Sequence, residues 1–138
     1  MNADRVFVDT NVLVYLYSGN NDDSGKRFRA YNALERYDCQ ISTQVLNEFS
    51  NICIKKLKID TNRIQGFIDQ ICSYFDLAYI DEDTIDNALE VHARYGYSYY
   101  DSLMVASALE RNCTYLLSED LADGQVIEDR LVIKNIFT

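Results

Sequence analysis

One short segment near the N-terminus sets the architecture of this chain: Arg5-Val6-Phe7-Val8-Asp9. Three consecutive apolar residues, two of them β-branched, predict a strand that is buried on both faces. The run ends on an acid, and ligands of α/β sheets bind at the carboxyl ends of the strands. Asp9 is therefore a candidate site residue, with capping of the following helix as the structural alternative.

Helices and short apolar strands alternate along the rest of the chain. We predict strands at 39–42, 77–80, 114–117 and 131–133, a loop at 19–23, and helices at 11–17, 24–37, 43–57, from 60 onward, at 81–95 and at 99–112. Thr43 suits the N-cap of its helix, and Gly96 suits a C-terminal stop. This order predicts an α/β fold, a three-layer α/β/α domain with a central, mostly parallel sheet.

The bulk properties fit one domain that comprises residues 1–138. The chain is 48% hydrophobic and 25% charged, and it contains no proline-rich linker or repeat. Its apolar runs are far shorter than the roughly 20 residues that span a bilayer, so we expect no membrane association. The cysteines, which form no C-x-x-C pair, predict free thiols in a reducing cytoplasm, with a disulfide pair as the alternative: Cys39, Cys53, Cys72 and Cys113.

The formal net charge of −9 argues against a nucleic-acid partner, because such proteins usually carry a basic surface. Two segments nevertheless concentrate basic residues, and solvated helix faces would explain them equally well. They comprise Lys26, Arg27 and Arg29, and then Lys55, Lys56, Lys58 and Arg63.

Three further acids occupy positions that need an explanation. Glu48 lies at the edge of a helical stripe of apolar residues, although a solvated flanking glutamate would look the same. Asp101 shares a predicted helix face with Met104, Val105, Ala108 and Leu109, where a lone carboxylate is costly. A capping box with Ser98 is the alternative for Asp101. Asp120 follows a predicted strand, where Glu119 and Asp123 compete for its role and an ordinary acidic turn is the alternative.

If the four acids converge, their repulsion requires a cation. An all-oxygen set of ligands suits Mg²⁺ or Mn²⁺ and not Zn²⁺. Such a site could activate a water molecule and neutralise the charge on a phosphodiester.

The order and spacing of these acids resemble the PIN-domain family over essentially the whole chain. The similar motifs are Phe7-Val8-Asp9-Thr10-Asn11-Val12-Leu13, Gln44-Val45-Leu46-Asn47-Glu48-Phe49, Ser98-Tyr99-Tyr100-Asp101-Ser102-Leu103-Met104-Val105-Ala106-Ser107-Ala108-Leu109 and Leu117-Ser118-Glu119-Asp120-Leu121-Ala122-Asp123-Gly124-Gln125. The third and fourth motifs together are the specific part of the resemblance.

The resemblance implies a PIN-like domain that acts as a Mg²⁺- or Mn²⁺-dependent endoribonuclease, most similar to VapC-type toxins of toxin–antitoxin pairs. It implies that Asp9, Glu48, Asp101 and Asp120 hold the metal and catalyse RNA cleavage by a metal-activated water. Thr10 or Asn11 would orient Asp9 and water, and Ser118 would support Asp120. It also implies an RNA substrate (tRNA, rRNA or mRNA), a cognate antitoxin protein laid across the acidic groove, and a homodimer.

Other functions are open at this stage. A catalytically weak PIN-like module would bind RNA or a partner without cutting. Asp9-Thr10-Asn11-Val12 partly resembles the haloacid-dehalogenase phosphatase motif, which requires an aspartate where Asn11 stands. A receiver-type phosphorylation switch has a similar size, but it needs an acidic pair at Asp9 and a lysine after its last strand, where Lys134 is poorly placed.

Overall fold

The structure of this chain is a computed structural model that describes residues 3–18 and 24–138; the loop predicted at 19–23 lies outside the described residues. The helices and strands follow one another in this order: β1 (Arg5–Val8), α1 (Thr10–Tyr17), α2 (Ser24–Leu34), β2 (Asp38–Ser42), α3 (Thr43–Lys55), α4 (Thr61–Tyr74), β3 (Asp76–Ala78), α5 (Glu82–Tyr95), α6 (Tyr99–Glu110), β4 (Tyr115–Leu117), β5 (Val126–Ile127) and β6 (Leu131–Lys134).

Within the described residues the strands form one sheet with the order β3-β2-β1-β4-β6-β5. All neighbouring pairs are parallel except β5 with β6. β1 lies in the centre, which explains why Val6, Phe7 and Val8 are completely buried. The predicted mostly parallel sheet is confirmed. Its order excludes the receiver alternative, because that fold places its first strand between the second and the third.

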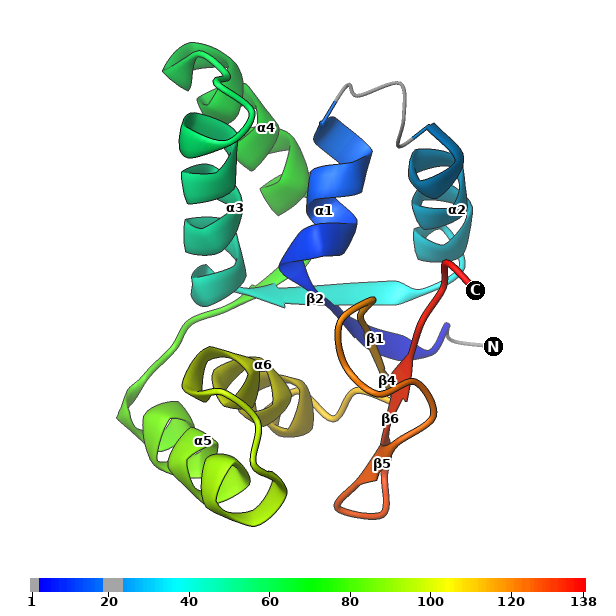
Figure 1. The fold of residues 1–138 in the computed structure, drawn as a ribbon, viewed down its shortest axis with the longest axis vertical. Helices are drawn as coiled ribbons and strands as arrows, with labels where there is room; N and C mark the ends of the chain where they lie inside the picture. The colour runs from blue at the N-terminus through cyan, green and yellow to red at the C-terminus, as the bar shows by residue number, and fades with distance from the viewer. Residues whose placement is uncertain (1–2, 19–23) are drawn as a thin grey trace.

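Helices cover both faces of the sheet, as predicted. Figure 1 shows α1, α2, α3 and α4 on one face and α5 with α6 on the other. α5 and α6 pack through a small apolar cluster built on Ala88, Leu103 and Ala106. α5 ends at Gly96, whose φ of 76° is the left-handed conformation expected at a helix stop.

Two local predictions were wrong, and one strand was missed. Ser42, and not Thr43, caps α3, since its hydroxyl accepts from the Val45 amide at 3.3 Å. α2 ends at Leu34 because i to i+3 bonds at Arg36 and Tyr37 tighten the following turn. The two-residue strand β5 was missed because so short a run carries no periodicity.

The burial of α6 also differs from the prediction of one apolar face. Every residue from Ser102 to Ala108 is buried, because the helix lies between the sheet and α5. All four cysteines are free thiols, which confirms their prediction. In residues 3–18 and 24–138 no helix combines the length and the hydropathy that crossing a membrane requires.

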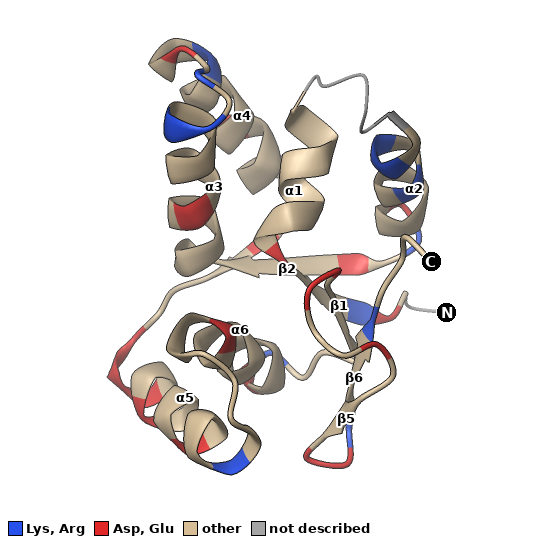
Figure 2. Cartoon of the chain, viewed as in Figure 1, with Lys and Arg blue, Asp and Glu red and all other residues tan. Residues whose placement is uncertain are grey.

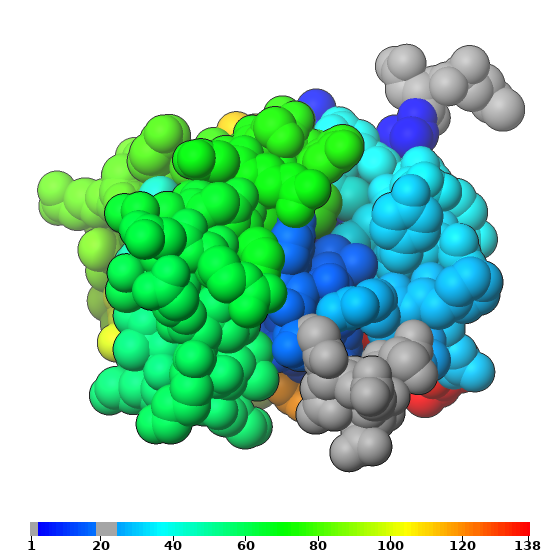
Figure 3. Space-filling view, turned by 90° about the horizontal axis from the view of Figure 1, so that it is seen from above, coloured from blue at the N-terminus to red at the C-terminus, as the bar shows by residue number. Residues whose placement is uncertain are grey.

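Charged residues are unevenly distributed over the fold (Figure 2). Acidic residues follow α5 and the loops around β5, whereas basic residues lie on α2 and around the turn between α3 and α4. Figure 3 shows α1 between α2 and the α3–α4 pair. An apolar pocket of about 580 Å³ opens there, and its lining includes Leu16, Tyr31 and Tyr74.

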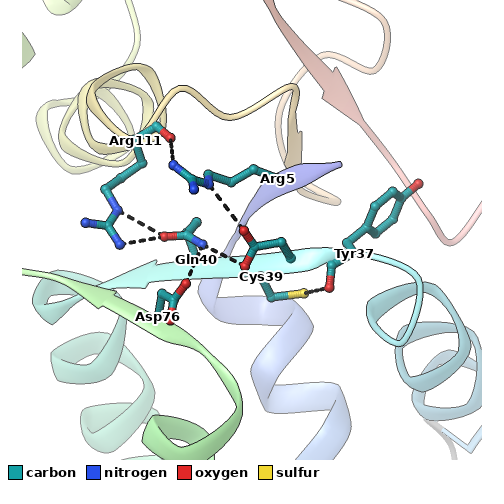
Figure 4. Close-up of polar contacts among 7 residues, drawn as sticks. Arg5, Tyr37, Cys39, Gln40, Asp76 and Arg111 are labelled. Atoms are coloured by element: carbon teal, nitrogen blue, oxygen red, sulfur yellow. Dashed lines mark hydrogen bonds and ion pairs between the residues drawn. The ribbon is translucent and has the colours of Figure 1, made fainter. Parts of the chain in front are cut away.

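A polar network around the buried Gln40 ties the amino-terminal side of the sheet together (Figure 4). The Gln40 side chain is completely buried, and its amide nitrogen donates to Asp38 at 3.1 Å and to Asp76 at 3.0 Å. Its amide oxygen accepts from the Arg111 guanidinium at 3.0 and 2.7 Å. Arg5 completes the set by donating to Asp38 and to the Arg111 carbonyl. β1, β2, β3 and the end of α6 are therefore linked by one network in which every member has a partner.

Candidate active site

The first acid, Asp9, follows β1 directly and lies at the carboxyl edge of the sheet. Its backbone amide donates to the Leu117 carbonyl at 3.0 Å, which fixes it beside the end of β4. Its carboxylate accepts from the Thr10 amide at 2.6 Å, so Asp9 is also the N-cap of α1. The second carboxylate oxygen accepts from the Ser118 hydroxyl at 2.7 Å. The capping role and the site position therefore coexist in one side chain.

The surroundings of Asp9 oppose its ionisation. Its side chain is only 8% exposed, and burial raises its pKa from 3.8 to about 6. The charges of Asp101 and Asp120 raise it further, whereas the hydrogen bonds from Ser118 and Thr10 lower it. A buried carboxylate whose pKa is raised by other acids is typical of functional sites.

The second acid, Glu48, projects from α3 and is half-buried. One carboxylate oxygen accepts from the Thr10 hydroxyl at 2.9 Å, and the other accepts from the Gln44 amide at 2.8 Å. Thr10 therefore contacts Asp9 through its backbone and Glu48 through its side chain. These contacts hold Glu48 toward the end of β1 and distinguish it from a freely solvated glutamate.

The third acid, Asp101, lies in the first turn of α6. Its amide donates to the Ser98 hydroxyl at 3.2 Å, so the cap considered from the sequence is present. Burial raises the pKa of Asp101, the Ser98 hydroxyl lowers it, and the charges of Glu48 and Asp120 raise it. Asp101 therefore belongs to the capping turn of α6, and the charges of Glu48 and Asp120 also act on its carboxylate.

The fourth acid, Asp120, is exposed in the loop after β4. It accepts from the Asn11 side-chain amide at 3.0 Å, and its own amide donates to Ser118 at 3.2 Å. Its two sequence competitors are engaged elsewhere. Glu119 pairs with Lys26 at 2.7 Å, and Asp123 accepts from the Asn135 amide at 2.9 Å. Asp120 is therefore the acid of this loop that is coupled to Asp9 and Asp101.

The fully buried Ser118 joins two of these acids. Its hydroxyl donates to Asp9 and accepts from the amides of Asp120 and Leu121. The predicted supporting residues Thr10, Asn11 and Ser118 all contact acids of the set, although the side chains of Thr10 and Asn11 reach Glu48 and Asp120 rather than Asp9. Gln44 received no role from the sequence, yet its i to i+4 spacing from Glu48 on one helix was the available signal.

The four acids influence one another without closing around a single point. Across the part of the chain that the structure describes, no three Asp, Glu, His or Cys side chains converge tightly enough to hold an ion as they stand. Burial is the main cause of the raised pKa values of Asp9 and Asp101, and the charges of the other acids raise both pKa values further.

The donor chemistry of this region fits a hard divalent cation. Carboxylates supply only oxygen atoms, which Mg²⁺ and Mn²⁺ prefer. Beside them, the buried Asn11 side-chain oxygen finds no hydrogen-bond donor among the described residues. A buried acceptor without a donor is costly, and an amide oxygen is itself a ligand for hard cations. The residues present therefore fit such a group.

Comparison by sequence identifies a family. The profile of the PIN domain matches residues 6–122, a range that contains all four acids. A search of curated proteins gives no match.

Comparison by structure finds several solved proteins of the same fold. A toxin–antitoxin complex from Klebsiella pneumoniae aligns with a TM-score of 0.69 at 20% identity, covering 92% of this chain and 95% of that one. VapBC2 from Rickettsia felis, bound to a DNA fragment from its promoter, aligns at 0.68 and 17% identity, covering 95% and 98%. The Mycobacterium tuberculosis toxin VapC20, which cleaves the sarcin–ricin loop, aligns at 0.65 and 16% identity, covering 80% and 86%. At these identities the likeness establishes the fold.

Proposed function

The chain belongs to the PIN domain family, and from this membership we propose that it is a Mg²⁺- or Mn²⁺-dependent endoribonuclease and the toxin of a toxin–antitoxin pair. Its catalytic acids in this proposal are Asp9, Glu48, Asp101 and Asp120. The family membership also argues against the haloacid-dehalogenase alternative, which Asn11 already disfavoured.

One observation carries the proposal. A carboxylate at the end of the central strand is buried, has a pKa of about 6, and is repelled by acids from α6 and from the loop after β4. A fold accumulates like charge in this way at a cost, and a cation that binds there offsets it.

The four carboxylates, with the Asn11 oxygen beside them, would hold the cation. When bound, the cation supplies charge neutralisation on the RNA phosphate and lowers the pKa of water. The protein's own part is to fix the acids. Ser118 and the Thr10 amide hold Asp9, Thr10 and Gln44 hold Glu48, and Asn11 holds Asp120. Such orienting contacts typically contribute about 10- to 100-fold to affinity or activity.

The partners in this proposal follow from the same membership. The substrate is RNA, drawn from tRNA, rRNA or mRNA, and the regulator is a cognate antitoxin protein. Solved relatives of this fold include toxin–antitoxin complexes, which supports the antitoxin. We further propose that the protein is cytoplasmic and that it forms a homodimer. Light scattering of the purified chain would test the homodimer.

The deciding experiment is RNA cleavage with matched variants. End-labelled tRNA, rRNA and mRNA are incubated with the protein in Mg²⁺ or Mn²⁺, with EDTA in parallel. Asp101→Asn removes a proposed ligand, and Asp69→Asn removes an exposed acid of α4 as the control. We expect cleavage that needs metal, that Asp69→Asn keeps, and that Asp101→Asn reduces more than about 100-fold, since mutation of merely orienting partners already costs about 10- to 100-fold.

Other outcomes point elsewhere. Cleavage that persists equally in Asp101→Asn would remove this acid from the site. RNA binding without cleavage under any metal condition would favour the catalytically weak binding module.

A further inference from the structure

A cationic pocket lies beside α2, apart from the four acids. It has a volume of about 350 Å³. No Asp or Glu side chain lines it. Its polar lining consists of three cationic and two amide side chains, which are Arg29, Arg36, Lys134, Asn32 and Asn135. In a chain with 22 acids and 13 bases, a pocket lined by three bases and no acid is unexpected.

The cations of this pocket are not neutralised by carboxylates. Within the described residues, none of the three forms an ion pair. Lys134 donates to the Tyr37 hydroxyl at 3.2 Å, and its ammonium lies 5.0 Å from the centre of the Tyr115 ring. The Arg36 guanidinium lies 5.7 Å from the centre of the Tyr37 ring. Aromatic rings thus hold Lys134 and Arg36 in position, whereas the Arg29 guanidinium donates to the Phe137 carbonyl. None of these contacts neutralises the positive charge, which stays available to an anion.

The pocket reaches the carboxyl edge of the sheet, where the acids lie, at Lys134, and it extends along α2 to Arg36, which precedes β2. Lys134 ends β6 and is in register with Leu117, which is in register with Val8 on β1. The Ser118 amide donates to the Lys134 carbonyl at 3.1 Å. Because neighbouring strands are about 4.8 Å apart, the end of β6 lies about 10 Å from the end of β1, where Asp9 begins the site. One nucleic-acid strand could therefore contact both places.

We propose that this pocket binds a backbone phosphate of an RNA strand whose cleaved bond lies at the four acids. The identity of the ligand as RNA rests on the proposed function. Phe28 lines the same pocket and is 67% exposed, so it offers a face on which a neighbouring base stacks. The pocket thus supplies local positive charge for RNA in a protein whose net charge is −9.

The test measures RNA binding in EDTA, where no cleavage occurs. A fluorescently labelled short single-stranded RNA is titrated with the protein over a range of salt concentrations. The variant combines Arg29→Gln, Arg36→Gln and Lys134→Gln. The charge-matched control combines Lys55→Gln, Lys56→Gln and Lys58→Gln at the far end of α3. Because Lys134 is half-buried, the double variant Arg29→Gln/Arg36→Gln of two exposed residues is measured as well.

The expected result is weaker binding with a shallower salt dependence. For each phosphate that the protein no longer neutralises, the magnitude of the negative slope of log K against log salt falls by about 0.7. We therefore expect this magnitude to fall by about 0.7 to 2 in the triple variant and not to change in the control. Phe28→Ala should weaken binding about fivefold or more without changing the slope. In Mn²⁺ the pocket variants should raise KM for RNA and leave kcat unchanged.

The outcomes separate this inference from the proposed function. Metal-dependent cleavage by the wild type, with the salt slope of the pocket variants unchanged, would overturn the pocket and leave the nuclease intact. RNA binding through the pocket without any metal-dependent cleavage would support the pocket and overturn the proposed nuclease. Polyglutamate that competes as well as RNA, with no effect of Phe28→Ala, would overturn RNA as the ligand and favour an acidic protein segment.

Discussion

Replacement of Asp9 by asparagine should stabilise the metal-free protein in a pH-dependent way. The pKa of Asp9 is 3.8 without its surroundings and about 6 in the fold, chiefly because the side chain is buried. At low pH the carboxyl is protonated in both states and costs nothing. As the pH rises past 3.8, the unfolded chain loses this proton first, so the folded state loses stability until Asp9 also ionises near pH 6.

The size of the effect follows from that rise. The difference between 3.8 and about 6 corresponds to about 3 kcal/mol. Linkage gives about 1.5 kcal/mol of this penalty at pH 5 and the full amount of about 3 kcal/mol at pH 8. Asparagine carries no charge, and its oxygen can still accept from the Thr10 amide. Its nitrogen, however, faces the Ser118 hydroxyl, which already accepts from two backbone amides, so the Ser118 hydrogen bond is lost at a cost of about 1 kcal/mol at either pH. Asp9→Asn should therefore gain about 0.5 kcal/mol at pH 5 and about 2 kcal/mol at pH 8.

The assay is urea unfolding followed by circular dichroism, in EDTA, at pH 5 and at pH 8. Asp69→Asn, an exposed acid of α4, is the control and should change little at either pH. A gain for Asp9→Asn that is the same at both pH values, or a loss at both, would refute the reasoning.

Three other predictions concern the metal, the network around Gln40 and the backbone. Saturating Mn²⁺, at about 100 times its Kd, should stabilise the wild type by about 2.7 kcal/mol and raise Tm by about 10 °C. Calorimetry would measure this shift in Tm, which should be smaller in Asp101→Asn. Gln40→Leu should cost about 3 kcal/mol in urea unfolding, because Arg111, Asp38 and Asp76 lose a buried partner, whereas the exposed Gln65→Leu should be nearly neutral. Gly66→Ala in α4, where nothing lies within 4 Å of the added methyl, should raise Tm, whereas Gly96→Ala at φ 76° should lower it, each by the equivalent of about 1 kcal/mol.

The framework of the fold was predictable because central parallel strands need continuous apolar runs. Val6-Phe7-Val8 carries that signal alone, and the acid after it marks the carboxyl edge of the sheet. The burial of α6 was not predictable, since a helix enclosed on all sides shows no polar face against which an apolar stripe stands out. The positions of residues along α6 alone could not reveal that this helix lies between the sheet and α5.

The candidate site was predictable by residue type but not by contact. Sequence motifs selected the four acids, yet they could not separate Asp120 from Glu119 and Asp123. That separation depends on Lys26 and Tyr15, which reach Glu119 from α2 and α1 and have no sequence pattern that links them to it. The same applies to the Thr10–Glu48 bond, which joins residues 38 positions apart. Long-range packing decides these details.

The pairing of β1 with β4 also determines when the site comes into existence during synthesis. Asp9 and the Ser118 hydroxyl that holds it are 109 positions apart. At a translation rate of about 5–20 residues per second, Asp9 is made about 5 to 20 s before its partner. A nascent chain that stops earlier carries Asp9 and Glu48 without the loop that fixes the first and without Asp120. Translation products that stop before Asp120 therefore have a first strand but no assembled site, so only chains extended past this residue can expose the cell to the chemistry proposed here.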